Sequence, residues 1–287
     1  MSAPRLFNRS LIALRLDRAI AAGPADFLLV RAAEDLGERL SIVKREFTDA
    51  LDFGTPGPHA AAVLAAARVT RIAPTQVSLG AGRFAGLVGD PERPPIAEGG
   101  FDLAVSLLAL HQIDDLPGAL IKLHRALKPD GLLIAALPGG DTLRELRECL
   151  LTAESEISGG ASPRVIPFAD ARALGGLLQR AGFALPVVDS DRFTVRYADM
   201  FALMRDLRAF GATNALDDRS RRFTRRALFL RAAALYAERF ADADGRVRAT
   251  FEILWLSGWV PHPSQRQPLA PGSAQMRLED AVKRKPS

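Results

Sequence analysis

The sequence predicts an α/β fold built on a mostly parallel, doubly wound sheet. In the first half of the chain, apolar runs of strand length alternate with segments of helical periodicity. The runs are continuously apolar, for example over residues 132–137, as in parallel strands that helices cover on both faces. Parallel strands need crossover connections, and the helical segments between the runs can supply them.

Composition indicates a globular chain with one large domain. The 287 residues are 48% hydrophobic and 25% charged, which excludes a fully disordered chain. No apolar run reaches the roughly 20 residues of a membrane-spanning helix. The single cysteine, Cys149, excludes an intramolecular disulfide framework and fits a reducing compartment. The net charge of +5, without zinc-finger spacing, gives no indication of a nucleic-acid partner.

We divide the chain into three parts. Residues 1–46 form an N-terminal helical segment, whose first, surface helix stops at Gly23. Residues 47–260 form the α/β domain, with a helical cap inserted at about residues 199–241. Residues 261–287 are rich in Pro, Ser, Gln and Gly and are expected to form an extended tail.

The first half of the α/β domain supplies most of the sheet. Its predicted elements are a strand at 47–53, an Ala-rich helix at 59–69, strand-like pieces at 69–72 and 76–79, a strand at 101–108, a helix at 115–127 and a strand at 132–137. The helix at 115–127 is the clearest, because its leucines and alanines recur at i, i+3, i+4 and i+7. A Lys-Pro-Asp-Gly turn at 128–131 separates it from the next strand.

The second half is richer in helices. Its predicted elements are helices at 142–156 and 168–181, strand pieces at 187–188 and 193–195, helices at 200–210 and 224–240, and a strand at 250–256. Thr142 and Glu145 have capping-box spacing, which predicts the start of the first of these helices.

A glycine turn follows the first strand, with the sequence Asp52-Phe53-Gly54-Thr55-Pro56-Gly57-Pro58. Such a turn between a strand and a helix lets backbone N–H groups approach a ligand closely. Ligands bind doubly wound sheets at the carboxyl ends of the strands, where the strand order reverses. We therefore expect the Gly54 turn and the loop of His111, which follows the fourth strand, to lie side by side.

Three stretches together carry a resemblance to a known superfamily: Asp-Phe-Gly at 52–54, Gly-Phe-Asp-Leu-Ala-Val-Ser at 100–106 and Leu-Lys-Pro-Asp-Gly-Leu-Leu at 127–133. Their order resembles class I S-adenosylmethionine-dependent methyltransferases of the Methyltransf_11 type. The resemblance implies a Rossmann-like fold with S-adenosylmethionine as the cofactor. It also implies four cofactor-binding residues: Asp52, Gly54, Gly57 and Asp90.

A narrower resemblance rests on residues 107–117, on Gly-Gly-Asp-Thr-Leu at 139–143 and on blocks near both chain ends, including Phe7-Asn8-Arg9, Gly258-Trp259, Ser264-Gln265 and Gly272-Ser273-Ala274. These segments are similar to the complex I assembly factor family, whose mitochondrial member is a protein arginine hydroxylase acting on a core subunit of NADH dehydrogenase. The resemblance implies a protein substrate, such as a soluble NADH dehydrogenase subunit. It implies the bacterial cytoplasm or the mitochondrial matrix as the location.

The chain departs from the superfamily pattern at the cofactor turn. Pro56 and Pro58 stand where the pattern has its second and third glycines, and a proline has no N–H to donate. The segment 71–76, at the end of the second strand, lacks the acid that holds the ribose hydroxyls in the superfamily. These departures leave three hypotheses open: a methyltransferase, a protein arginine hydroxylase, or a non-catalytic chaperone on the same fold.

Two residues are the catalytic candidates. His111 could act as a general base or bind an acidic group, or simply pack on the next helix. Asp141 could accept hydrogen bonds from the guanidinium of a substrate arginine, or serve as a helix N-cap.

The remaining polar features point to no further active site. The arginines between residues 219 and 231 form either a solvated face or a docking patch for an acidic protein. No histidine and carboxylate spacing indicates a metal site, so a hydroxylase mechanism follows from the resemblance alone.

Overall fold

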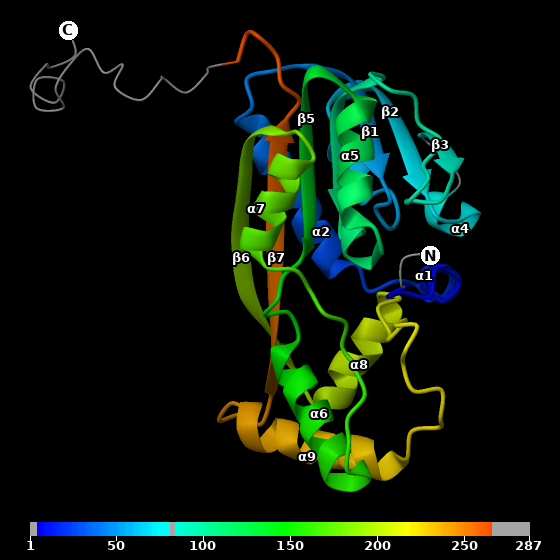
Figure 1. The fold of residues 1–287 in the computed structure, drawn as a ribbon. Helices are drawn as coiled ribbons and strands as arrows, with labels where there is room; N and C mark the ends of the chain where they lie inside the picture. The colour runs from blue at the N-terminus through cyan, green and yellow to red at the C-terminus, as the bar shows by residue number, and fades with distance from the viewer. Residues whose placement is uncertain (1–4, 81–83, 266–287) are drawn as a thin grey trace, which may run out of the picture.

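The computed structural model describes residues 5–80 and 84–265, which form a seven-stranded sheet flanked by helices (Figure 1). The strands are β1 (Phe47–Phe53), β2 (Ala66–Ala73), β3 (Ala85–Val88), β4 (Phe101–Leu107), β5 (Leu127–Pro138), β6 (Ala184–Tyr197) and β7 (Val247–Trp259). Their order in the sheet is β3-β2-β1-β4-β5-β7-β6, and only β7 runs antiparallel to its neighbours. The prediction of a mostly parallel, doubly wound sheet is confirmed, with the later strands added at one edge.

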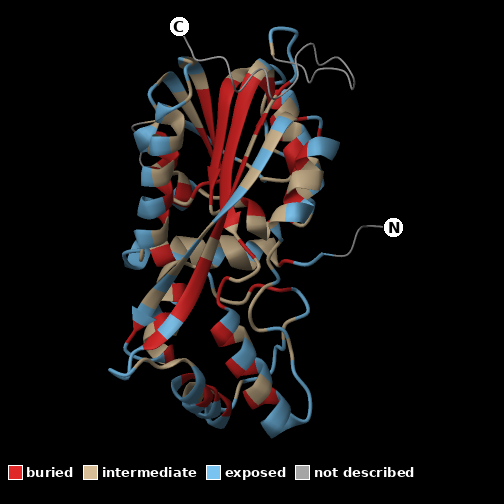
Figure 2. Cartoon of the chain, turned by 90° about the vertical axis from the view of Figure 1, so that its left-hand side faces the viewer, coloured by how far each residue is buried: buried red, intermediate tan, exposed pale blue. Residues whose placement is uncertain are grey.

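Helices cover both faces of the sheet (Figure 2). They are α1 (Arg9–Ala22), α2 (Phe27–Ser41), α3 (His59–Val63), α4 (Gln76–Leu79), α5 (Leu116–Ala126), α6 (Arg144–Ser158), α7 (Ala171–Arg180), α8 (Met200–Ala209) and α9 (Arg226–Phe240). On one face Leu120 of α5 and Leu178 of α7 pack with Leu133 of β5. On the other face Leu36 of α2 packs with Val105 of β4. The apolar strands are therefore buried from both sides, as continuous apolar runs predict.

A second core lies beyond the sheet, where β6 and β7 extend toward α6, α8 and α9 in the lower part of Figure 1. Leu146 of α6, Leu203 of α8 and Leu235 of α9 are buried there with Phe251 of β7. Helices α8 and α9 occupy the segment predicted as a cap. The division of the chain into three parts remains a proposal, and residues 266–287 of the predicted tail lie outside the described residues.

Two short elements after β2 differ from the prediction. Residues 76–79 form helix α4 instead of a strand, because Thr75 and Ser78 make reciprocal side-chain to backbone bonds that cap the helix. The strand β3, which was not predicted, is apolar in sequence but only four residues long, too short to show a period. The helix predicted at 59–69 ends at Val63, because the chain from Ala66 already pairs with β1.

Several predicted boundaries also shift in the second half. The capping box proposed for Thr142 and Glu145 is wrong: α6 begins at Arg144, after Leu143 in a left-handed conformation with φ of 56°. The Thr142 hydroxyl instead donates to the backbone oxygen of Glu252 and accepts from its N–H, and the Glu145 carboxylate binds Thr250. These bonds fasten α6 to β7. The two predicted strand pieces after α7 are one continuous strand, β6.

Within the part of the chain that the structure describes, no helix has the length and apolar character needed to cross a membrane.

Candidate functional site

A cavity of about 490 Å³ lies at the carboxyl ends of the parallel strands, within the 300–1,000 Å³ range usual for ligand pockets. The Gly54 turn and His111 both line it, and a Cβ built on Gly54 would lie 3.1 Å from the Cβ of Ala109 in the His111 loop. The prediction that these two loops lie side by side is therefore confirmed.

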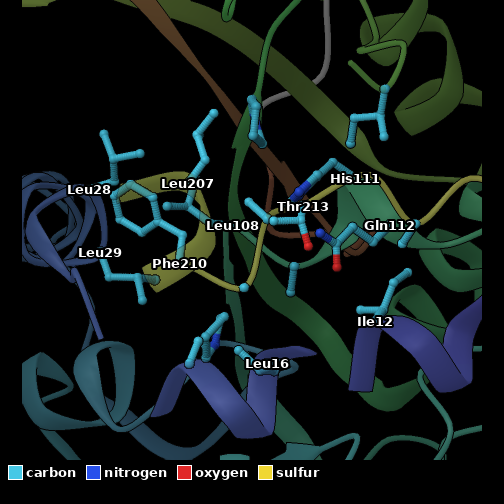
Figure 3. Close-up of a pocket in the computed structure, with 18 of the residues that line it drawn as sticks. Ile12, Leu16, Leu28, Leu29, Leu108, His111, Gln112, Leu207, Phe210 and Thr213 are labelled. Atoms are coloured by element: carbon cyan, nitrogen blue, oxygen red, sulfur yellow. The ribbon is translucent and has the colours of Figure 1, made fainter. Parts of the chain in front are cut away.

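The cavity wall is mostly apolar, and helices outside the sheet contribute part of it (Figure 3). Helices α1, α2 and α8, with the residue after α8, contribute Ile12, Leu16, Leu28, Leu29, Leu207 and Phe210. His111, Gln112 and Thr213 bring polar atoms to the same space (Figure 3). The cavity thus suits a ligand that is largely apolar at one end and polar near the strand ends.

The glycine turn offers this cavity few hydrogen-bond donors. Gly54 and Gly57 have φ of 77° and 74°, the left-handed conformations that such a turn requires. The carbonyl oxygens of Thr55 and Gly57 both accept bonds from Arg71. The residues that follow these two carbonyls are Pro56 and Pro58. Because a proline has no N–H, neither residue can donate a hydrogen bond to a ligand.

Arg71 of β2 holds the turn in place from inside the protein. Its side chain is 4% exposed, and its Nε donates to Oδ2 of Asp52 at 2.9 Å. Its Nη1 donates to the carbonyl of Leu79 in α4 at 2.5 Å. Arg71 therefore ties the end of β1, the cofactor turn and α4 together. One sequence signal could have revealed this role: Arg71 lies in the apolar end of a predicted strand, and the preceding strand carries an acid, Asp52, near its end.

Burial dominates the electrostatics of Asp52. It raises the pKa of this carboxyl to about 6, although Arg71 and Thr55 act in the opposite direction. The Oδ1 atom has no hydrogen-bond partner among the described residues. Asp52, the acid of the superfamily's glycine-turn pattern, thus forms an ion pair with Arg71 in this chain.

Asp90, the second retained acid, is also paired with an arginine. Nη1 of Arg9 lies 2.6 Å from Oδ1 of Asp90 and 3.3 Å from Oε2 of Glu92. All three side chains line the cavity. The sequence singled out neither Arg9 nor Glu92 as a site residue, because the contact joins α1 to a loop 81 residues further along the chain.

His111 is half-buried in the cavity wall, and its ring centroid lies 6.2 Å from that of Phe168. Burial lowers its pKa to about 4, so the imidazole is neutral at physiological pH. Its Nδ1 has no hydrogen-bond partner among the described residues. The neutral imidazole has an unpartnered nitrogen that can take a proton, but a pKa of about 4 makes it a weaker base at neutral pH than an ordinary histidine.

Asp141 faces a different neighbourhood. Its carboxylate pairs with the guanidinium of Arg192 on β6, and its N–H donates to Oε2 of Glu252 at 3.0 Å. It is absent from the residues that line the cavity, whereas Glu252 lines it. The alternative role of Asp141 as the N-cap of α6 is wrong, because Leu143 occupies that position and no side chain caps the helix.

The donor set of the cavity does not match S-adenosylmethionine as the superfamily binds it. The two prolines provide no N–H, the end of β2 provides no carboxylate, and Asp52 and Asp90 already hold arginines. Among the residues that the structure describes, no group of three or more His, Cys, Asp or Glu side chains could hold a metal ion.

The strand order, the single antiparallel strand and the turn after β1 define a protein of the class I methyltransferase fold. A family model for a methyltransferase domain matches residues 51–135. The YcgJ protein of Bacillus subtilis has the same fold, with a TM-score of 0.55 and 13% identity over 80% of this chain and 99% of its own. The [4+2]-cyclase SpnF has a TM-score of 0.53 and 17% identity over 91% of this chain and 99% of its own.

Sequence relatives define the family more narrowly. The mitochondrial arginine-hydroxylase NDUFAF5 of Danio rerio is 38% identical over 97% of this chain and 90% of its own length. The human protein is 38% identical over 90% of this chain and 77% of its own length. A malonyl-[acyl-carrier protein] O-methyltransferase of Laribacter hongkongensis is 34% identical over 92% and 94%. This chain belongs to the NDUFAF5 arginine-hydroxylase family.

Proposed function

We propose that this chain modifies the side chain of an arginine in a protein substrate during assembly of NADH dehydrogenase. The observation that carries the proposal is the 38% identity to arginine hydroxylases over nearly the whole chain. The arginine-hydroxylase relatives are mitochondrial by name, which supports the mitochondrial matrix as the place of action; in a bacterium the proposed place is the cytoplasm.

The chemistry of the cavity supports this proposal. Oε2 of Glu92 lies 3.3 Å from Nη1 of Arg9 in the cavity wall, so this rim presents a carboxylate at a distance suited to a guanidinium. His111 is neutral at physiological pH and can accept a proton at Nδ1. The proposed roles are therefore guanidinium binding by carboxylates and proton transfer by His111.

Asp141 is the other proposed guanidinium-binding residue; it does not line the cavity itself, but its N–H bonds to Glu252, which does. Its pair with Arg192 is partly exposed, with side-chain exposures of 36% and 54%. Ion pairs at that exposure contribute only about 0–1 kcal/mol, so a substrate arginine can displace Arg192.

Deletion of the gene tests in cells whether the protein supports complex I assembly and whether it modifies the target arginine. We expect reduced complex I in the deletion strain, with the target arginine lacking its added oxygen in peptide mass spectrometry. Asp141→Asn should reproduce the defect without unfolding the protein, because the amide keeps the shape and loses the charge. Asp189→Asn is the matched control, since Asp189 also pairs with an exposed arginine, Arg39. Full recovery of complex I with Asp141→Asn would remove Asp141 from the site, and normal complex I in the deletion strain would reject the proposed function.

We further propose that Asp52, Gly54, Gly57 and Asp90 form what remains of an S-adenosylmethionine site. Replacing both Pro56 and Pro58 with glycine should strengthen S-adenosylmethionine binding in calorimetric titration, because two N–H donors are restored. In this double-glycine variant, adding Asp90→Ala should weaken S-adenosylmethionine binding by about 1–3 kcal/mol, the cost of a lost hydrogen bond to a charged group. Equal affinity in the Asp90→Ala variant would place the ligand elsewhere.

The same titration separates the three functional hypotheses. Tight binding by the parent protein, with methyl transfer, would favour the methyltransferase hypothesis that the O-methyltransferase relatives support. Reduced complex I with no modified arginine would leave the non-catalytic chaperone. Arginine oxygenation without tight S-adenosylmethionine binding is the outcome that we expect.

A further inference from the structure

A strongly basic segment stands between α8 and α9. Residues 219–226 contain five arginines and no acidic residue: Arg219, Arg221, Arg222, Arg225 and Arg226. Arg219 bonds to the carbonyl of Leu216, whereas the other four have no ion pair with any described residue. Elsewhere, Arg231 and Arg239 on α9 are paired with Glu156 and Glu148 of α6. Arg205 and Arg208 of α8 also lack an ion pair among the described residues, but residues 219–226 hold the densest group of unpaired arginines in the cap.

An apolar groove opens beside this charge. Phe223, in the middle of the arginines, is 95% exposed, and Leu230 on α9 is 50% exposed. Both line a second cavity of about 390 Å³, together with Phe201, Thr224, Arg226 and Phe229. These two exposed apolar side chains line one groove beside the arginines, and apolar surface rimmed by polar residues favours an interaction site.

The groove lies next to the main cavity. Phe229 lines both spaces. Thr224 lines the groove and accepts a bond of 3.2 Å from Arg164, which itself lines the main cavity. A chain that docks at the groove would therefore lie next to the cap-side wall of the main cavity.

We propose that the Phe223 groove and the surrounding arginines dock an acidic segment of the protein substrate, with one of its apolar side chains in the groove. Unpaired guanidinium groups favour carboxylates, and the recessed groove supplies an apolar contact that an extended peptide can fill. The proposal rests on the proposed function for the identity of the partner. It assigns to the cap the task of holding the substrate while its arginine enters the main cavity.

Binding of a synthetic peptide tests the proposal. The probe is a fluorescein-labelled peptide of aspartate and glutamate with central leucine and phenylalanine residues and no arginine. We expect it to bind the full-length protein, and Arg222→Glu/Arg225→Glu to weaken binding at least tenfold. Phe223→Ser should weaken it several-fold, and so should replacement of the two central apolar residues of the peptide by serine. Arg172→Glu/Arg180→Glu on α7 is the matched control, with the same charge change at exposed arginines that have no ion pair among the described residues, and binding should be retained.

Other outcomes would overturn the proposal. Equal weakening by the α7 control would show attraction by net charge alone. Tighter binding to phosphatidylglycerol vesicles or to single-stranded RNA than to the peptide would assign the groove to a lipid surface or a nucleic acid. Because the peptide contains no arginine, its binding is independent of arginine modification. Peptide binding with an unmodified target arginine would thus retain the docking site and reject the proposed function.

Discussion

Arg71 is the residue on which the shape of the cofactor turn most depends. Arg71→Met should lower the free energy of unfolding by about 3–5 kcal/mol at neutral pH, because it leaves Asp52 buried without its partner. Adding Asp52→Asn should recover part of that loss. Arg68→Met on the same strand is the control, since its pair with Asp49 involves an arginine side chain that is 70% exposed and should cost less than about 1 kcal/mol. Urea denaturation measures all three, and equal losses for Arg71 and Arg68 would contradict the role assigned to Arg71.

His111 gives stability a defined dependence on pH. Its pKa is about 4 in the folded protein and near 6.5 when unfolded, so between these values the unfolded state binds more protons. The His111 contribution is therefore present above pH 6.5 and lost as the pH falls toward 4. Since one pKa unit corresponds to about 1.4 kcal/mol, the parent should lose about 2–3 kcal/mol relative to His111→Gln over this window. Asp52 has the opposite slope and is common to both proteins, so the difference between their urea denaturation curves isolates His111. A difference that does not change with pH would show that the imidazole is not desolvated.

Single residues were the part of the site that the sequence predicted least completely. Asp52, Gly54 and His111 follow from position alone, because the carboxyl ends of parallel strands meet at one edge. Arg71, Arg9, Glu92 and Arg192 could not be found in this way. Their partners lie between 19 residues away in the chain, for Arg71 and Asp52, and 83 residues away, for Arg9 and Glu92, and only the folded arrangement brings the charges together.

Among the helices and strands, hydrophobic periodicity and turn residues predicted the long elements well and the short elements poorly. The strand at 47–53 has the predicted bounds, and α5 lies within its predicted segment, because their apolar patterns are continuous or strongly amphipathic. Helix α4 and strand β3 have four residues each, too few to show any period. The start of α6 was missed because Thr142 and Glu145 bind β7 instead of the helix backbone, a tertiary contact that no local pattern contains.

The long β6–β7 pair couples the cap to the sheet. Leu235 on α9 is 2% exposed and packs in the cap core, so Leu235→Ala should cost about 2–5 kcal/mol. Because β6 and β7 run through both cores, we expect the fluorescence of Trp255 and Trp259, which reports the sheet core, and far-UV circular dichroism to give one shared, lowered midpoint in urea. Leu230→Ala on the same helix, where Leu230 is 50% exposed, should change little. Separate midpoints for the two signals would show that cap and sheet unfold independently.

In the whole molecule, the proposed catalytic residues and the proposed docking groove lie in different halves. The sheet half carries the Gly54 turn, His111 and the carboxylates that face the cavity, while the cap half carries the Phe223 groove. The cavity lies where these halves meet α1 and α2 (Figure 3). Catalysis and docking can therefore be impaired separately by substitution.

The Arg71 network also restricts the mutational routes open to this sequence. Removing Arg71 alone leaves the buried Asp52 without its ion-pair partner. Replacing Pro56 or Pro58 alone restores only one N–H donor to a turn whose carbonyl oxygens still bond to the Arg71 guanidinium. The three positions therefore constitute an epistatic unit: a return to the glycine-rich turn of the superfamily gains little at any single step and loses stability at one of them. We therefore expect substitutions at the three positions to be non-additive, with the combined change differing from the sum of the single changes in both stability and ligand binding.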